Sequence, residues 1–375
     1  MLIVFRFALT VDRDAVAIVN QISLYKPHTK VRGSAGSHMS KVALLFLTRG
    51  PMPLEPIWRR FLESAGDWEK LFLVLVHAPS GYKYSEESIF YQREISNPVP
   101  DVQWGQHSVM EAERRLLAAG LEVGGPTEAA SHFVLLSETT IPLYHPVIIY
   151  MSIVKDVKSR VNACMNSSDP GDGQKRMVFR LQEGMQQAGV TTETWRKSAQ
   201  WFLLIRRHAE LIARETEINA VFEKECFVKH SESGQRGFYR FCVSDEHYIP
   251  TVLAVRHLES ECVCDGEATR VIWRGNTFHP VQFNERDATR EVLDNSLRSR
   301  AACPQAVQLE EFLKRPRDSN SSMAEIALKL VDELEDGDNF TVLPATCPLF
   351  ARKIDPSAAS AERWLQLLSD DVLLE

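Results

Sequence analysis

The chain has few of the residues that would form a disulfide scaffold or a zinc site. It contains seven cysteines in 375 residues. None of them occurs in a paired CxxC pattern, so a structural zinc site is not expected. Seven cysteines are also too few for a scaffold held together mainly by disulfides. Cys262 and Cys264 are too close in sequence to bridge each other easily.

An excess of positive charge is also absent. The chain has 43 Lys and Arg residues against 50 Asp and Glu residues, which gives a formal net charge of −7. A nucleic-acid-binding protein needs a basic surface that displaces counterions, and this sequence has no basic stripe. Nucleic acid is therefore excluded as the main partner. An anionic small molecule is not excluded, because a local group of Arg and Lys does not show in the total charge.

The common signatures of nucleotide binding and hydrolysis are missing as well. No Walker loop, GxSxG elbow or GxGxxG motif follows any of the expected strands. Their absence removes the most frequent P-loop, dinucleotide-binding and α/β-hydrolase interpretations. The hydrophobic content of 44% is nevertheless sufficient for a sizeable core in one large domain or two.

The beginning of the sequence has no long hydrophobic run. Residues 1–10 are apolar apart from Arg6, whereas a bilayer core requires roughly twenty apolar residues. We therefore expect residues 1–40 to be an appendage, such as a signal-like segment, a stem or a truncated anchor. Sequons at Asn166, Asn320 and Asn339 would permit N-glycosylation in a secretory compartment.

Continuous apolar runs alternate with helical patterns in the rest of the chain. Residues 42–47, 71–77 and 132–137 predict strands that are buried on both faces, as in a parallel sheet. The alternation predicts an α/β fold, with a doubly wound, mostly parallel sheet flanked by helices. We expect one large domain over residues 41–375, with a variable, charged insertion at about residues 308–340 that carries its own helix.

Ligands of such sheets lie beyond the carboxyl ends of the strands. In this chain those ends carry Thr48, Arg49, His77, Ser137 and Glu138. These residues are therefore candidates for contacts with a bound molecule. For His77 the alternative is a structural histidine whose hydrogen bonds are satisfied within the core.

The segment Asp245–Pro250 combines two acids and a histidine at the expected start of a helix. A carboxylate on Glu246 in this position could be held rigidly and act as a general base. The alternative is a purely structural capping box, in which Ser244 pairs with His247 and the acids favour the helix dipole. The spacing of these residues alone favours the capping interpretation.

Several segments resemble, in the same order, the plant-type branch of the core-2/I-branching β-1,6-N-acetylglucosaminyltransferase family. They are KVALLFLTRGPMP (41–53), WG (104–105), AERRLL (112–117), FVLLSETTIPL (133–143), WRKSAQWF (195–202), DEHYIP (245–250), HP (279–280) and FARK (350–353). Each motif is weak alone, but their collinear order is specific. The resemblance implies a GT-A-like fold and a single inverting displacement from a UDP-sugar, with no metal ion.

The resemblance assigns the chemistry to particular residues. It places the general base at Glu246 and the phosphate-binding cation at Lys353, with Arg352 and Arg274 as weaker candidates. Thr48, Arg49 and His77 end the first two strands, where the donor nucleotide should lie. The third strand ends in Ser137-Glu138-Thr139, so the DXD motif of metal-dependent relatives is absent. The alternative for Lys353 is a solvated surface lysine. For Arg274, the following residues 275–278 depart from the family pattern.

The sugar and acceptor contacts are assigned less directly. Candidates are Asp245, Ser137 and Glu138, together with Trp104 and Trp195, whose rings could stack on sugar faces or belong to the core. Arg196 and Lys197 fit either the sugar site or a solvated surface. The resemblance also implies a disulfide between Cys226 and Cys242 in an oxidising lumen.

Together these features predict an inverting, metal-independent transferase that needs no cofactor beyond its donor. It would move a sugar, N-acetylglucosamine by resemblance, from a UDP-sugar to a glycan or glycoprotein acceptor. The family implies a type II membrane enzyme with a lumenal catalytic domain in the Golgi or another secretory membrane. The alternative is a catalytically silent carbohydrate-binding or scaffold member of the same fold.

Overall fold

The computed structural model describes most of the chain beyond its first 39 residues. The described residues are 40–123, 129–166, 171–226, 242–275, 279–304, 310, 313, 321–335 and 343–371. The predicted appendage, apart from residue 40, lies outside them, as do the sequons at Asn320 and Asn339 and about half of the insertion at 308–340. Within the described residues, no helix is both long and apolar enough to cross a membrane.

The central sheet has four strands in the order β2-β1-β3-β5. Strands β1 (Lys41–Leu47), β2 (Phe72–His77) and β3 (Ala130–Ser137) are parallel to one another, and the short β5 (Leu203–Ile205) runs antiparallel to β3. The three continuous apolar runs therefore form parallel, buried strands as predicted.

A second sheet of three strands has the order β4-β7-β6. It contains β4 (Ile141–Pro142), β6 (Thr269–Val271) and β7 (Phe350–Arg352), with β7 antiparallel to β4 and parallel to β6. Only a short turn separates β3 from β4, so the end of β7 lies beside that turn. The Ile354 amide donates to the Thr139 carbonyl at 3.0 Å. The sequence indicated one sheet, because such short strands have no distinctive periodicity.

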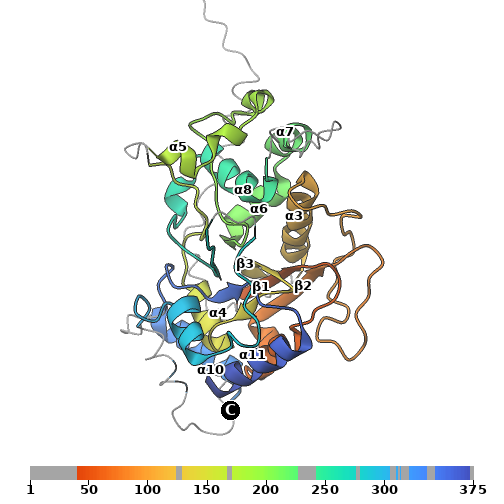
Figure 1. Ribbon diagram of the computed structural model, residues 1–375, viewed down its shortest axis with the longest axis vertical. Coiled ribbons are helices and arrows are strands. Elements are labelled where there is room, and N and C mark those ends of the chain that lie inside the picture. Colours follow the sequence, from red (N-terminus) through yellow and green to blue (C-terminus); the bar gives the residue numbers. More distant parts are fainter. Residues whose placement is uncertain are drawn as a thin grey trace, which may run out of the picture. The chain divides into compact units, whose positions relative to one another are not determined.

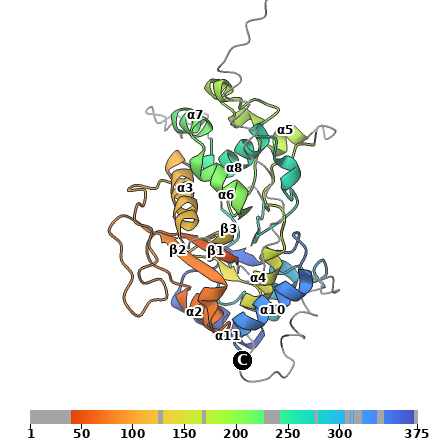
Figure 2. The same cartoon turned by 180° about the vertical axis from the view of Figure 1, so that it is seen from behind.

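Helices cover both faces of the central sheet (Figures 1 and 2). On one side, α3 (His107–Glu122) and α6 (Arg206–Arg214) pack against the strands, and α8 (Ser244–Val255) and α7 (Glu217–Glu225) extend the same hydrophobic cluster. The other packs against α2 (Glu55–Glu63), α4 (Pro146–Val154), α10 (Met323–Glu335) and α11 (Ala358–Asp371). Alternate residues of β1 serve the two layers, since Ala43 and Leu45 face the first group and Leu44 faces the second. The predicted α/β fold with a parallel-rich, helix-flanked sheet is confirmed.

Short helical pieces occupy several segments that connect the longer elements. They are η1 (Trp68–Lys70), α5 (Asp172–Lys175), η2 (Val178–Arg180), η3 (Glu183–Ala188), η4 (Glu259–Glu261) and the π-helix η5 (Val292–Leu297). The described part of the polar stretch after α4 therefore contains short helices, and one of them, η2, carries Arg180.

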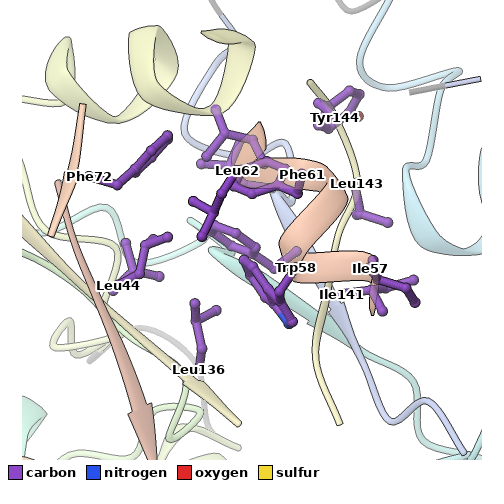
Figure 3. Packing of buried hydrophobic residues seen from close by; sticks show 14 of the residues in the cluster. Leu44, Ile57, Trp58, Phe61, Leu62, Phe72, Leu136, Ile141, Leu143 and Tyr144 are labelled. Atoms are coloured by element: carbon purple, nitrogen blue, oxygen red, sulfur yellow. The ribbon is translucent and has the colours of Figure 1, made fainter. Parts of the chain in front are cut away.

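Trp58 of α2 fixes the turn that follows β3. Its indole nitrogen donates to the Thr140 carbonyl at 3.0 Å, and its ring contacts Phe46, Phe61 and Phe350. Figure 3 shows this packing, with Trp58 beside the strand that carries Ile141. Because the indole is fully buried, its N–H needs this partner. The core thereby positions the residues at the carboxyl end of β3.

Three disulfides join loops to this core. They are Cys164–Cys264, Cys226–Cys242 and Cys303–Cys347, and Cys262 remains a buried free thiol. The Cys226–Cys242 bridge, implied by the family resemblance, is present. The other two pairs join residues 100 and 44 positions apart, so no local pattern in the sequence indicates them. They supplement an extensive hydrophobic core, whereas in a disulfide scaffold the bridges take the place of a core.

Candidate active site

A group of charged side chains lies where β1, β3 and β7 end. Arg49 follows β1, Glu138 follows β3, and Arg352 and Lys353 come at the end of β7. The Arg49 Nε atom lies 3.8 Å from Glu138 Oε1, although the Arg49 side chain is 86% exposed. The Ile354–Thr139 backbone hydrogen bond fixes β7 beside the same turn. The structure therefore brings three predicted cations together around one carboxylate.

These cations interact electrostatically with one another. Burial lowers the pKa of Arg352 to about 10, and the negative charges of Glu138 and Asp245 oppose that shift. Burial lowers the pKa of Lys353 too, and the positive charges of Arg352 and Arg49 add to the effect. Since the cations repel one another, an anion bound among them would relieve that repulsion. This arrangement suits a phosphate or diphosphate.

An aromatic ring packs against the Arg352 guanidinium. Its central carbon lies 4.0 Å from the centroid of the Trp201 ring, a cation–π contact. Trp201 is the seventh residue of the WRKSAQWF motif, which has no helix or strand over residues 195–202. This segment connects the cationic group to the residues around Glu246.

Glu246 lies in the first turn of α8, but not in a capping box. The helix begins at Ser244 after the N-cap residue Val243, with no side-chain capping bond. The Ser244 hydroxyl donates instead to the Gln106 carbonyl at 2.8 Å. The Nδ1 atom of His247 pairs with the Arg196 carbonyl at 2.6 Å. The structural alternative built on Ser244 and His247 is therefore wrong for this helix.

The Glu246 carboxylate is held from one side. Arg180 Nη1 lies 2.9 Å and Lys197 Nζ 3.4 Å from the same oxygen, Oε2. Within the described residues, Oε1 accepts no hydrogen bond. The Glu246 backbone carbonyl accepts from the Ser198 amide at 2.9 Å. The side chain keeps 25% of its surface exposed, so this carboxylate is oriented yet accessible.

Asp245 couples the two charged groups. Burial, together with the Glu246 charge, raises its pKa to about 7. Arg180 and Lys197 oppose this rise. Its Oδ1 atom is buried and has no hydrogen-bond partner among the described residues. Because its charge also acts on Arg352, Asp245 is electrically linked to both ends of the candidate site.

The family model described as Branch: Core-2/I-Branching enzyme matches residues 42–296. The chain belongs to this family of enzymes. It is also similar to "Glycosyltransferase BC10" of Oryza sativa subsp. japonica, with 30% identity over 274 residues. That match covers 67% of this chain and 64% of the relative, so the chain spans less than two thirds of the relative's length.

The structure is also similar to one solved for an active-site mutant of LgtC. The sequence identity is 10% and the TM-score is 0.35. The superposition covers 88% of this chain and 95% of the other.

In this family member, some predicted site residues have structural partners. Trp195 has no exposed surface, and its ring stacks on His247 at 4.3 Å and on Phe222 at 5.8 Å. It is a core residue, so the predicted stacking on a sugar was wrong. The Ser137 hydroxyl is buried and bonds to the hydroxyls of Thr139 and Thr140. Ser137 therefore shapes the turn that presents Glu138.

Thr48 and His77 are likewise engaged within the fold. The Thr48 hydroxyl donates to the His77 carbonyl at 3.3 Å and accepts from the Gly50 amide at 3.2 Å. The His77 Nε2 atom accepts from the Val99 amide at 2.8 Å, and burial lowers the pKa of His77 to about 4. The imidazole of His77 is therefore buried and neutral, as the structural alternative requires, but its Nδ1 atom is buried without a hydrogen-bond partner among the described residues, so its hydrogen bonds are not all satisfied.

Two further candidates are exposed. The Trp104 ring is 58% exposed and lies 6.2 Å, centroid to centroid, from the ring of His279, so a family WG residue meets a family HP residue. Arg274 is exposed on the segment after β6, and residues 276–278 beyond it are outside the described part. Sugar stacking by Trp104 and phosphate binding by Arg274 stay predictions.

Several residues around Glu246 were not selected from the sequence. Gln200 and Trp201 belong to the WRKSAQWF motif, and their polar or aromatic character was the available signal. Lys197 of the same motif was considered only for the sugar site or a solvated surface, and the structure places it beside Glu246. Arg180 comes from a polar stretch with no motif, so only the fold reveals its approach to Glu246. Glu113 is in the AERRLL motif, where its buried position on α3 could not be inferred from the motif alone.

Two surface hollows lie apart from the candidate site. One of 580 Å³ is lined mainly by α2 and α11, and one of 310 Å³ by α3, α7 and neighbouring loops. Neither contains Glu246 or Lys353, so the charged chemistry marks the candidate site and hollow size does not. Among the described residues, no group of three or more His, Cys, Asp or Glu side chains could hold a metal ion.

We predict that His247 stays neutral and makes the fold sensitive to acid. Burial lowers its pKa to about 3, and the Arg196 carbonyl requires the proton to be on Nδ1. The unfolded chain takes up a proton near pH 6.5, whereas the folded chain resists it. The stability contributed by neutral His247 is therefore full above about pH 6.5. It decreases by about 1.4 kcal/mol per pH unit as the pH falls from about 6.5 to about 3, where the folded chain also takes up the proton.

Nitrogen-15 NMR of the histidine rings would check this prediction. We expect the His247 signals to stay those of the Nδ1–H tautomer from about pH 8 to about pH 5. The exposed His257 serves as an internal reference for a solvent-accessible ring. Titration of His247 near pH 6.5 would contradict the buried, neutral assignment.

Proposed function

We propose that the protein is an inverting glycosyltransferase that uses a nucleoside-diphosphate sugar and needs no metal ion. Family membership supports a sugar-transferring enzyme with a donor and an acceptor. The observation that carries the proposal is the placement of Glu246, an oriented and accessible carboxylate. Asp245 links it electrically to the cations Arg352 and Lys353.

In this mechanism, Glu246 acts on the acceptor. Its Oε1 atom takes the proton of an acceptor hydroxyl while the hydroxyl oxygen attacks the anomeric carbon of the donor sugar. The Arg180 and Lys197 contacts to Oε2 stabilise the negative charge that a base must carry before it accepts a proton. One displacement forms the new glycosidic bond and inverts the anomeric configuration.

The cations at the end of β7 act on the leaving group. As the bond from the anomeric carbon to the diphosphate breaks, its electron pair leaves with the nucleoside diphosphate, and the growing negative charge faces Lys353 and Arg352. Trp201 holds the Arg352 guanidinium in a fixed orientation for this task. The sequence has no DXD motif after β3, and fixed side-chain cations supply the charge in this proposal.

The identity of the sugar rests on the resemblance of the sequence motifs. We propose UDP-N-acetylglucosamine as the donor and a glycan or glycoprotein as the acceptor. Release of UDP from a panel of sugar nucleotides would test the donor directly. A protein that binds UDP but transfers no sugar would instead be the silent carbohydrate-binding or scaffold member considered from the sequence.

Replacement of the proposed base tests the mechanism. Glu246→Gln keeps the size of the side chain but cannot take the acceptor proton. We expect transfer to fall about 10²- to 10⁴-fold, with the fold and UDP binding retained. The control is Glu86→Gln, at an exposed carboxylate in the loop after β2. If Glu246→Gln transfers sugar within a few-fold of wild type at saturating acceptor, Glu246 is not the base.

Chelation and loss of Lys353 test the role of the fixed cations. Activity is expected to survive excess EDTA, and Lys353→Ala is expected to weaken UDP binding or to slow the transfer step. Calorimetric titration of UDP and single-turnover rates would separate these two effects. Lys158→Ala, which removes an exposed lysine elsewhere, is the matched control. Complete inhibition by EDTA that manganese reverses would refute the metal-free proposal.

We also propose that the protein works in the secretory lumen, at a Golgi or equivalent membrane. The three disulfides and the exposed Asn166, which begins a sequon, support an oxidising, glycosylating compartment. Expression of the native transcript with its 5′ end sequenced, followed by endoglycosidase treatment and cell fractionation, is the test. We expect a mobility shift and lumenal fractionation. An unglycosylated cytosolic protein with free thiols would exclude this location.

A further inference from the structure

Glu113 is a buried acid on α3 that the proposed mechanism does not yet use. Only 1% of the surface of Glu113 is exposed. Oε1 accepts a hydrogen bond from Gln200 Nε2 at 2.9 Å. Oε2 is buried and has no hydrogen-bond partner among the described residues. Burial of an ionised carboxylate that has no cation beside it costs free energy of folding, so the charge state and the position of Glu113 both need a physical reason.

The partner of Glu113 lies in the segment that holds Glu246. Gln200 is two residues after Ser198, whose amide donates to the Glu246 carbonyl at 2.9 Å. Lys197, one residue earlier, lies 3.4 Å from Glu246 Oε2. The Ser198 hydroxyl in turn accepts from the Asn162 amide at 3.1 Å. Residues 195–202 form no helix or strand, so these contacts determine where the segment lies.

The charges around Glu113 favour its uncharged form. Burial raises the pKa of Glu113 well above its usual range, and the negative charge of Asp245 adds to the rise. The hydrogen bond from Gln200 opposes it. From α8, Glu246 faces Asp245 as a further negative charge, while the cations Arg180, Lys197 and Arg352 act on these acids from other elements.

We propose that Glu113 is a positioning residue, held as a neutral carboxylic acid, that fixes Gln200 and thereby the Lys197–Ser198 contacts that orient Glu246. The neutral form keeps the acceptor oxygen for Gln200 without adding a second negative charge beside Asp245. This role rests on the proposed function, because it acts through the proposed base. It assigns no contact with the substrate to Glu113.

A pair of variants separates the hydrogen bond from the charge. Glu113→Gln is isosteric, permanently neutral and still offers a carbonyl oxygen to Gln200. Glu113→Ala removes the acceptor altogether. Glu122→Ala, at an exposed position near the end of the same helix, is the control for general effects on α3. Each variant is compared with wild type by transfer kinetics, by hydrogen exchange of the Ser198 amide and by thermal unfolding from about pH 5 to about pH 8.

The expected results differ between the variants. Glu113→Ala should lower kcat about ten- to a hundred-fold, with little change in the KM for the donor, because the base is misplaced. It should also speed exchange of the Ser198 amide. Glu113→Gln should restore both values to within about threefold of wild type. Wild type should become less stable relative to Glu113→Gln as pH rises. The unfolded wild-type chain loses the Glu113 proton at a lower pH than the folded chain does, whereas the glutamine has no proton to lose.

Two results would overturn the proposal. If Glu113→Gln is as damaging as Glu113→Ala, the charged carboxylate is required and the neutral assignment fails. If Glu113→Ala leaves Ser198 exchange unchanged, Glu113 does not position the segment. Both results can be read from Ser198 amide exchange and thermal unfolding alone. They therefore test the role of Glu113 even if wild type transfers no sugar and the proposed function fails. Glu113→Ala that does not fold would leave Glu113→Gln, whose exchange and pH-dependent stability decide the question.

Discussion

The candidate site depends on the buried guanidinium of Arg196. This side chain is 3% exposed, and it donates to the carbonyls of Ala163 at 2.8 Å and Glu193 at 2.6 Å while it also pairs with Glu259. Its backbone amide donates to the hydroxyl of Thr251 in α8. A buried charge is tolerated only when it is hydrogen-bonded and paired. These bonds hold the irregular segment 195–202 against α8, so the segment passes Glu246, Glu113 and Arg352 in turn.

From that segment the charges divide into two groups with different surroundings. Near α8, Arg180 and Lys197 share one oxygen of Glu246, and their charges largely compensate a single acid. At the end of β7, the charges of Arg49 and Glu138 act on both Arg352 and Lys353, and Lys353 also faces the positive charge of Arg352. The α8 cations directly contact the carboxylate that they share, whereas at the β7 end the positive charges of Arg352 and Arg49 help to lower the pKa of Lys353. An anion is therefore stabilised most at the β7 end, whereas the α8 end holds an ionised acid in place.

The sequence was most informative where a local pattern determines the result. Continuous apolar runs identified β1, β2 and β3, and parallel strands necessarily bring Arg49 and Glu138 to the same edge. It was least informative where burial decides a residue's role. Trp195 has the same composition signal as Trp104, yet one is in the core and the other is exposed. Arg180 reaches Glu246 across 66 residues of sequence, and no spacing rule encodes such a contact.

The two oxygens of Glu246 explain how one carboxylate can be both fixed and reactive. A carboxylate free to rotate would spend much of its time misdirected, and a small misplacement can cost about 10²-fold in rate. Arg180 and Lys197 limit that rotation through Oε2 alone, while the Ser198 amide fixes the backbone. Because no described residue bonds to Oε1, orientation does not block the oxygen that is proposed to take the proton. The neighbouring Asp245, with a pKa of about 7, then adjusts the negative charge that surrounds this base. The α8 end of the site is thus set by the same contacts that determine where residues 195–202 lie.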